Sequence, residues 1–382
     1  MTGVVVLGST GSIGRQTLEV IAAHRDRFSV VGFAAGRATA AFQAQVAAWP
    51  AARAWCTDSR PRELPRERWA AGGLEELATL EEADIVVVAT TGMAALSAVM
   101  AALASGRRVA LANKETLVTG GHLVRAELAR LGGDPLERLR PIDSEHSAIW
   151  QCLLGERLTD VRRLVLTASG GPFRGRAAAE LEGVTSAEAL AHPTWQMGPK
   201  ITIDSSTLVN KAFEAIEAKW LYQLPYDRIQ AVIHPQSVVH SLVEFTDGSY
   251  KAQLGLPDMR LPIQYALTHP ERLPSPARHG SPEEWGDLQF AALAPGRYPA
   301  YDAVRSAAEM GGNRGTILNA ADEAAVAAFL AGTIRFPRIA AVISDAVERW
   351  GTPDEPDLEG IVALDGEVRA ALSIELGLGG AA

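Results

Sequence analysis

Lysine is scarce in this chain. The 382 residues include 36 lysines and arginines together, but only five of these are lysines: Lys114, Lys200, Lys211, Lys219 and Lys251. Arginine therefore supplies nearly all of the positive charge that solvates the surface. Lysine differs from arginine because its ammonium is a compact point charge that can lose its proton. Three of the five lysines lie in segments that carry other signs of function, and we interpret them as positions that need an ammonium group.

Cysteine, long apolar runs and net positive charge are also lacking. The two cysteines, Cys56 and Cys152, are too few for a disulfide framework, which favours a reducing cytoplasm. Apolar runs fall short of the ~20 residues of a membrane span, and no basic stretch precedes the first apolar run, so we expect neither a membrane segment nor a signal peptide. The net charge of −9 argues against nucleic acid and anionic membranes as partners.

The first part of the chain has the pattern of an α/β domain. Short β-branched runs at 4–7, 28–34, 85–89 and 108–111 alternate with amphipathic stretches at 13–23, 93–104 and 117–131. Such alternation predicts a doubly wound parallel sheet of the Rossmann type. We assign residues 1–145 to this nucleotide-binding domain, and we expect the proline-rich, charged stretch 59–68 to be a surface loop.

The second part has a different pattern. Strand-like runs at 164–167, 231–233, 238–245 and 250–254 predict an antiparallel or mixed sheet, with a hairpin turn at Asp247-Gly248. We assign 146–270 to an α+β catalytic domain for metal and substrate, 271–297 to a proline-rich linker arm, and 298–382 to a small helical domain that packs or braces. The exposed edge of the hairpin favours a homodimer.

A glycine-rich segment follows the first predicted strand and opens a helix. It reads Gly8-Ser9-Thr10-Gly11-Ser12-Ile13-Gly14, a G-x-x-G-x-x-G spacing that lets the backbone turn tightly and approach a pyrophosphate at the helix N-terminus. A NAD site usually ends its second strand with an acid, whereas here the strand runs into Gly36-Arg37. A guanidinium suits a 2′-phosphate, so NADPH is favoured. The alternative is that Arg37 is a solvated loop residue.

Residues 198–219 predict a small anion site combined with a carboxylate. We expect a short extended run, an N-cap at Ser205 and Ser206, and then a helix. Asn210, Lys211 and Glu214 share one face of that helix, because residues three and four apart are neighbours. A phosphorylated substrate whose far end touches a metal would fit this arrangement. The alternative is a surface helix with ordinary side-chain pairs.

Two further carboxylates follow a short apolar stretch. In an extended segment Asp143 and Glu145 would point the same way, and with Glu214 they would form an all-oxygen site for Mn²⁺ or Mg²⁺, or alternatively Co²⁺. The alternative is a helix N-cap around Ser144.

Taken together, the motifs resemble those of the 1-deoxy-D-xylulose 5-phosphate reductoisomerase family of the non-mevalonate isoprenoid pathway. The matching segments are GSTGSIG (8–14), LANKE (111–115), DSEH (143–146), TASGGPF (167–173), HPTWQMG (192–198), DSSTLVNK (204–211) with Glu214, and HPQSVVHS (234–241). They span most of the chain in the family's order.

The resemblance implies a role for each matching residue. NADPH would contact Thr10, Gly11, Ser12, Ile13, Gly36, Arg37, Ala38, Asn113, Glu115 and Gly198, although Ala38 stands where the family often has a polar side chain. Asp143, Glu145 and Glu214 would bind the metal and, with Lys114 and His192, form the catalytic group. The substrate would contact Lys114, Ser144, Glu145, Ser169, His192, Ser205, Asn210, Lys211 and Glu214. Residues 192–198 match the family's lid, in which Trp195 would close over the substrate.

The implied reaction converts 1-deoxy-D-xylulose 5-phosphate to 2-C-methyl-D-erythritol 4-phosphate, which requires rearrangement on a Lewis acid and reduction by NADPH. Two alternatives remain at this point. One is a metal-free NADPH reductase of another aldehyde, and the other is a non-catalytic NADP-sensing regulator.

Overall fold

The structure, a computed structural model, describes residues 1–192 and 197–378. The chain divides into two compact units. Unit 1 contains Met1–Thr116, Leu123–Trp150 and Asp258–His279, and unit 2 contains Leu117–His122, Gln151–Pro257 and Gly280–Ala382. The catalytic and helical regions that the sequence suggested as separate domains thus lie in one compact unit, and Asp258–His279 returns to the first.

Unit 1 alternates strands and helices, as the sequence predicts. Its elements are β1 (Thr2–Leu7), α1 (Ser12–Ala23), β2 (Phe28–Ala35), α2 (Ala40–Ala48), β3 (Arg53–Cys56), η1 (Arg66–Arg68), α3 (Gly73–Ala78), β4 (Ile85–Val88), α4 (Leu96–Ala104), β5 (Arg108–Leu111), α6 (Pro135–Arg138), β6 (Leu139–Pro141) and α11 (Arg260–Thr268). Two more helices, α5 (Glu115–Leu131) and α7 (Ser144–Leu153), have residues in both units.

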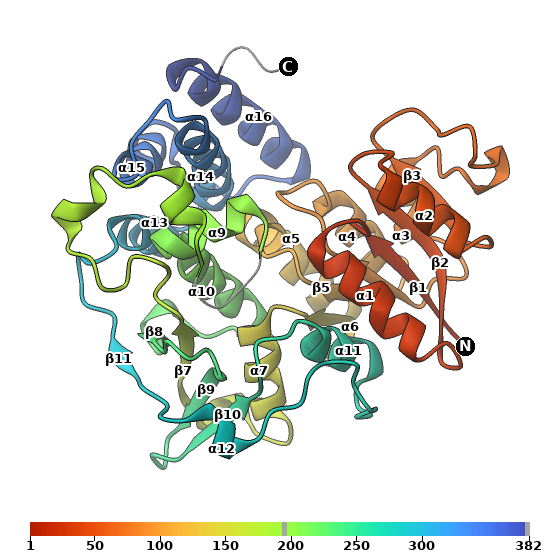
Figure 1. Cartoon of the computed structure of the whole chain (residues 1–382), viewed down its shortest axis with the longest axis horizontal. Coiled ribbons are helices and arrows are strands. Elements are labelled where there is room, and N and C mark those ends of the chain that lie inside the picture. Colours follow the sequence, from red (N-terminus) through yellow and green to blue (C-terminus); the bar gives the residue numbers. More distant parts are fainter. Residues whose placement is uncertain (193–196, 379–382) are drawn as a thin grey trace. The chain divides into compact units, whose positions relative to one another are not determined.

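The strands of unit 1 form a six-stranded sheet in the order β3-β2-β1-β4-β5-β6. Strands β1, β2, β3 and β5 are labelled in Figure 1. All neighbours are parallel. This order is that of the dinucleotide-binding fold, in which ligands bind beyond the carboxyl ends of the strands. The predicted doubly wound sheet is therefore confirmed.

Helices cover both faces of this sheet because its central strands are apolar on both sides. Val4 and Val6 share a buried cluster with Ile21 of α1 and Ile263 of α11. On the other face, a side chain at Gly32 would meet Leu77 of α3 at 3.0 Å. Continuous apolar runs such as β1 are the expected result of burial on both faces.

Unit 2 combines a second sheet with a helical region. Its elements are η2 (Leu158–Asp160), β7 (Val161–Ala168), η3 (Ala178–Leu181), α8 (Ser186–Leu190), α9 (Pro199–Thr207), α10 (Val209–Tyr222), η4 (Tyr226–Arg228), β8 (Ile229–Ile233), β9 (Val239–Phe245), β10 (Tyr250–Leu254), α12 (Pro282–Trp285), β11 (Ala291–Ala292), α13 (Pro299–Met310), α14 (Arg314–Ala331), α15 (Arg338–Trp350) and α16 (Leu358–Glu375).

The sheet of unit 2 is mixed, as predicted. Its order is β10-β9-β7-β8-β11, with β7 and β8 parallel and the β9–β10 hairpin antiparallel. One large apolar core joins α9 and α10 to the C-terminal helices, with Phe213, Ile317 and Ile343 fully buried in it. The helical tail therefore holds the helices that carry Ser205 and Glu214.

One prediction about local structure in unit 2 was wrong. The run expected to be extended after Gly198 is helix α9, and Ser205 and Ser206 lie in its last turn instead of at an N-cap. The stretch 59–68 is mostly exposed and contains no strand or α-helix, as expected of a surface loop, although Leu64 within it is fully buried. No helix in the described part of the chain is long and apolar enough to cross a membrane.

Candidate functional site

The turn between β1 and α1 can approach a phosphate closely because of its glycines. Gly8 has φ +89°, and a Cβ atom there would lie 2.3 Å from the Ala89 carbonyl oxygen. A Cβ at Gly14 would lie 2.2 Å from the Gly8 carbonyl oxygen. Gly11 is the N-cap of α1 and no side chain caps this helix end, so the turn has the form of an anion site that the sequence predicted.

The exit of β2 contains the residues expected to choose the nucleotide. Gly36 and Arg37 are exposed beyond the end of the strand. The Ala38 backbone N–H donates to Oδ2 of Asp58 at 2.8 Å. Asp58 follows β3, which pairs with β2 and ends beside it. Asp58 was not among the predicted site residues, because the four-residue strand β3 was not predicted and only its pairing with β2 brings this carboxylate to the β2 exit.

Asn113, Lys114 and Glu115 form the link from β5 to α5. The buried Asn113 side chain donates to the Thr90 and Gly92 carbonyls at 2.9 and 2.8 Å, which ties together the exits of β4 and β5. Its amide also donates to Glu115 at 3.1 Å. This arrangement fixes the backbone at the carboxyl edge of the sheet.

Asp143 and Glu145 do not form the extended pair that we expected. Helix α7 begins at Ser144, and the Asp143 carbonyl accepts the helical bond from Ser147 N at 2.8 Å. The N-cap alternative therefore describes the backbone correctly. The two carboxylates nevertheless offer oxygens within 4.8 Å of one another. Ser144 Oγ donates to Glu145 Oε2 at 2.6 Å.

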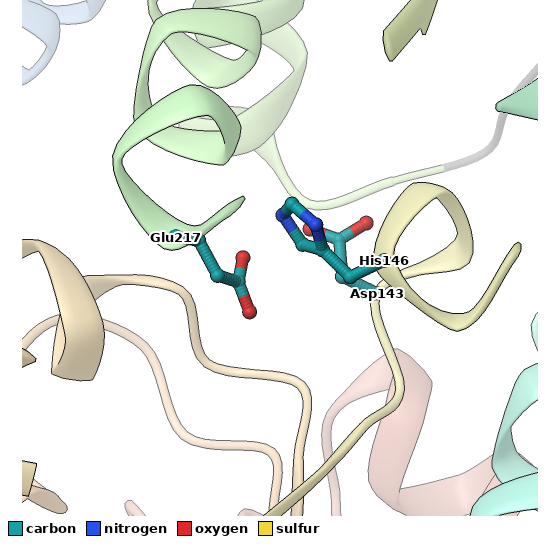
Figure 2. A group of neighbouring side chains, drawn as sticks. All are labelled: Asp143, His146 and Glu217. Carbon is teal, nitrogen blue, oxygen red and sulfur yellow. The ribbon is translucent and has the colours of Figure 1, made fainter. Parts of the chain in front are cut away.

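A lysine and a histidine flank Asp143. Lys114 Nζ lies 2.6 Å from Asp143 Oδ2, and both side chains are about nine-tenths buried, with 8% and 10% exposed. His146 comes from the first turn of α7 and offers a ring nitrogen within 4.8 Å of an Asp143 oxygen (Figure 2). His146 was part of a matching motif but had no predicted role.

In unit 2, three predicted substrate residues meet around one imidazole. Nε2 of His192 lies 3.2 Å from Ser169 Oγ and 3.1 Å from Ser205 Oγ. Burial lowers the pKa of the His192 ring. Gly171 makes this packing possible, since a Cβ there would lie 2.6 Å from the Ser205 carbonyl oxygen. The neutral ring and two hydroxyls offer both donors and acceptors to an anion.

Helix α10 carries the other predicted group. It begins after Leu208, whose left-handed backbone (φ 58°) separates it from α9. Asn210 Nδ2 donates to Glu214 Oε1 at 2.6 Å, and Lys211 Nζ donates to Glu214 Oε2. Lys211 and Glu214 are 3% and 1% exposed. The shared helix face is confirmed, but the group is buried and is not on a surface helix.

Glu217, drawn in Figure 2, is a fully buried carboxylate one turn after Glu214 that had no predicted role. Two predicted positions contribute less to this geometry. Gly198 is the exposed N-cap of α9. Trp195 and the rest of 193–196, the centre of the predicted lid, lie outside the described residues.

The two units thus contain different parts of the predicted site. Unit 1 holds the glycine turn, the β2 exit, Lys114 and the carboxylates of Asp143 and Glu145. Unit 2 holds the His192 cluster and Glu214 with its two donors. A dinucleotide-binding sheet and buried, charge-paired carboxylates are typical of an oxidoreductase that works with a nicotinamide nucleotide.

The comparisons with known proteins identify the family. Three family models match: 1-deoxy-D-xylulose 5-phosphate reductoisomerase over residues 4–121, the C-terminal domain of that enzyme over 139–222, and the DXP reductoisomerase C-terminal domain over 254–371. The 1-deoxy-D-xylulose 5-phosphate reductoisomerase of Thermomicrobium roseum is 50% identical, covering 95% of this chain and 94% of its own. That of Pelotomaculum thermopropionicum is 48% identical, covering 96% of both chains.

Solved structures agree with the sequence relatives. The crystal structure of DOX-P reductoisomerase in complex with NADPH, fosmidomycin and magnesium has a TM-score of 0.90 at 35% identity and covers 99% of both chains. The Zymomonas mobilis reductoisomerase in complex with NADPH has a TM-score of 0.88 at 38% identity, covering 98% of this chain and 99% of its own. The chain belongs to the 1-deoxy-D-xylulose 5-phosphate reductoisomerase family.

Proposed function

We propose that this chain catalyses the NADPH- and divalent-metal-dependent rearrangement and reduction of 1-deoxy-D-xylulose 5-phosphate to 2-C-methyl-D-erythritol 4-phosphate. The observation that carries the proposal is 50% identity to a reductoisomerase over 95% of the chain. The placement of the motif residues within each unit supports it.

The nucleotide would lie at the carboxyl edge of the parallel sheet. We assign its pyrophosphate to Thr10, Gly11, Ser12 and Ile13 at the start of α1, where added Cβ atoms at the flanking Gly8 and Gly14 would collide with the backbone. The 2′-phosphate would face the β2 exit, at Gly36, Arg37 and Ala38. We assign the nicotinamide side of the nucleotide to Asn113, Glu115 and Gly198.

The metal would be held by Asp143, Glu145 and Glu214. Their carboxylate oxygens are the hard ligands that Mg²⁺ and Mn²⁺ prefer, so the donor set fits. When bound, the metal would polarise the substrate carbonyl as a Lewis acid. The chain's own contribution is orientation: Asn210 and Lys211 fix the Glu214 carboxylate, and Lys114 fixes that of Asp143.

The substrate phosphate would be held in unit 2. Ser169 and Ser205 lie within hydrogen-bond distance of the His192 imidazole, and the three side chains would supply polar hydrogens without a buried net charge. We also assign Lys211 on α10 to the phosphate, as the source of an ammonium. Binding energy from the phosphate can then position the reacting carbons near Lys114 and the metal ligands Asp143 and Glu145. Ser144 and Asn210 complete the predicted contacts.

Family membership weighs against both alternatives raised by the sequence. A metal-free aldehyde reductase would leave buried Glu214 and its two donors without a role, and a non-catalytic sensor would not need them either.

The direct test is NADPH oxidation with 1-deoxy-D-xylulose 5-phosphate, before and after removal of metal by chelation. We expect oxidation only with both the substrate and added Mn²⁺ or Mg²⁺. Glu214→Gln should abolish turnover while NADPH binding survives, and Glu359→Gln on the exposed start of α16 is the matched control. Full turnover after chelation, or none with this substrate, would contradict the proposal.

We also propose that the enzyme is a cytoplasmic homodimer. Both cysteines are free thiols buried in the structure, which suits a reducing compartment. Strand β10 is an edge of its sheet and exposes Tyr250 (49%) and Leu254 (39%). Edge strands with exposed apolar residues favour pairing with a second copy.

A further inference from the structure

The exit of β2 carries a carboxylate that comes from a different strand. Asp58 Oδ2 accepts from the Ala38 backbone N–H at 2.8 Å. The hydroxyl of the preceding Thr57 donates to the Gly36 carbonyl oxygen. Residues 57–58 therefore run alongside 36–38, because β3 pairs with β2 up to Ala35 and Cys56.

This position matters for the choice of nucleotide. In dinucleotide-binding folds, an acid at the β2 exit accepts from the ribose 2′-hydroxyl of NAD and repels the 2′-phosphate of NADP. The second strand of this chain ends without an acid, but Asp58 brings one to the same turn from β3. Within the described residues, no ion pair neutralises Asp58, and its side chain is exposed.

The backbone donor at this turn is also occupied. Ala38 offers only its N–H to a 2′-phosphate, since its side chain is a methyl group. Asp58 already accepts that hydrogen. Arg37 is then the single positive group of the turn, and it must act against a fixed negative charge next to it.

We propose that Asp58 is a specificity-determining residue that limits the preference of this site for NADPH over NADH. It does so by occupying the Ala38 N–H and by placing a carboxylate beside the 2′ position. The inference rests on the proposed function, because it takes the nucleotide to bind at the carboxyl edge of the unit 1 sheet.

The test is Asp58→Asn, which retains an acceptor for the Ala38 N–H and removes the charge. Binding is measured by titration with NADPH and NADH, and with the adenosine fragments 2′,5′-ADP and 5′-AMP. The variant should bind NADPH and 2′,5′-ADP about three- to tenfold more tightly, as expected for removing an exposed charge next to a phosphate dianion. NADH and 5′-AMP should change by less than about twofold. High salt should reduce the gain because it screens exposed charges.

Asp26→Asn is the matched control. Asp26 is exposed in the turn before β2, at the opposite end of that strand, and the substitution makes the same change in net charge. It should leave all four affinities unchanged. Asp58→Ser is the second charge-removing variant, in case the asparagine disturbs the turn.

Three results would overturn the inference. The first is unchanged NADPH affinity in both Asp58 variants. The second is equal weakening of NADPH and NADH binding, which would show that Asp58 only stabilises the structure of the turn. The third is an equal gain in the Asp26 control. Failure of the proposed function is separate, because it appears as a lack of turnover of 1-deoxy-D-xylulose 5-phosphate by the parent enzyme, whereas these results concern only nucleotide affinities.

Discussion

The buried ion pair between Lys211 and Glu214 allows a quantitative test of the site. The two side chains are 4% and 1% exposed on α10. Lys211→Met keeps the length of the side chain and removes the ammonium. The Glu214 carboxylate then stays buried with Asn210 as the hydrogen-bond donor on its own helix.

The expected loss of stability is large. Removing one partner of a buried pair costs about 3–5 kcal/mol, because the remaining charge stays desolvated after it loses the opposite charge. Replacing an exposed lysine on a surface helix would change the free energy of unfolding by only ~0.5 kcal/mol. We therefore expect Lys211→Met to lower the free energy of unfolding by ~3 kcal/mol in metal-free buffer.

Metal should reduce this loss. If Glu214 is a metal ligand, a bound cation compensates the charge that Lys211 no longer compensates, so the variant should gain more from Mn²⁺ than the parent does. A ligand at a hundred times its Kd stabilises by ~2.7 kcal/mol, and tighter binding adds to that figure. We expect the difference in unfolding free energy between the variant and the parent to shrink by at least ~1 kcal/mol in saturating Mn²⁺.

The assay is urea unfolding of both proteins with a chelator and with Mn²⁺. Lys219→Met is the control on the same helix: Lys219 lies over the Trp220 and Tyr226 rings at 4.8 Å each, and loss of such contacts costs about 1 kcal/mol without metal dependence. A loss below ~1 kcal/mol for Lys211→Met would refute the burial argument. A loss that is equal with and without Mn²⁺ would refute the role of Glu214 as a ligand.

Three further predictions concern other parts of the chain. Arg37→Glu should weaken NADPH by ~1.5–3 kcal/mol but NADH much less, as measured by fluorescence titration, and equal effects would show that Arg37 does not contact the 2′-phosphate. The His234 ring accepts from the backbone amides of residues 238 and 239 at 3.2 and 3.1 Å, and burial lowers its pKa. The unfolded state then binds the proton more readily, so the free energy of unfolding should rise with pH up to about 6.5, the usual pKa of histidine, and level off above it. An equally steep rise of the unfolding free energy with pH in His234→Asn would contradict this. Leu254→Lys on β10 should convert a dimer to monomers in light-scattering mass measurements, whereas Val362→Lys on α16 should not, and a monomeric parent enzyme would reject the dimer.

The sequence predicted the parts of the fold and site that depend on local spacing. The glycine turn follows from three glycines at fixed separations after an apolar strand, and its backbone needs them at Gly8 and Gly14. The shared face of Asn210, Lys211 and Glu214 follows from helical periodicity. Each of these two patterns lies within one short segment, so the sequence of that segment is enough to predict it.

The errors have a common cause, which is tertiary context. Ile201, Thr202 and Ile203 have β-branched side chains, yet they lie in α9, where Pro199 starts the helix and residues 202–207 are buried. The carboxylate of Asp58 reaches the β2 exit only through pairing of β2 with β3, a four-residue strand with weak periodicity. Local pattern cannot reveal a partner that pairing between distant strands supplies.

The scarcity of lysine is consistent with the contacts that the lysines make. Lys114 pairs with Asp143, Lys211 with Glu214, and Lys200 with both Asp204 and Asp322. In each case the carboxylate partner is at least about nine-tenths buried. An ammonium fits such a space as a point charge, whereas a guanidinium needs room for a planar fork. Asp143 and Glu214 are also two of the three proposed metal ligands. An ammonium beside each carboxylate fixes its orientation, as a metal ligand requires. This explains why a chain that otherwise uses arginine retains lysine at these positions.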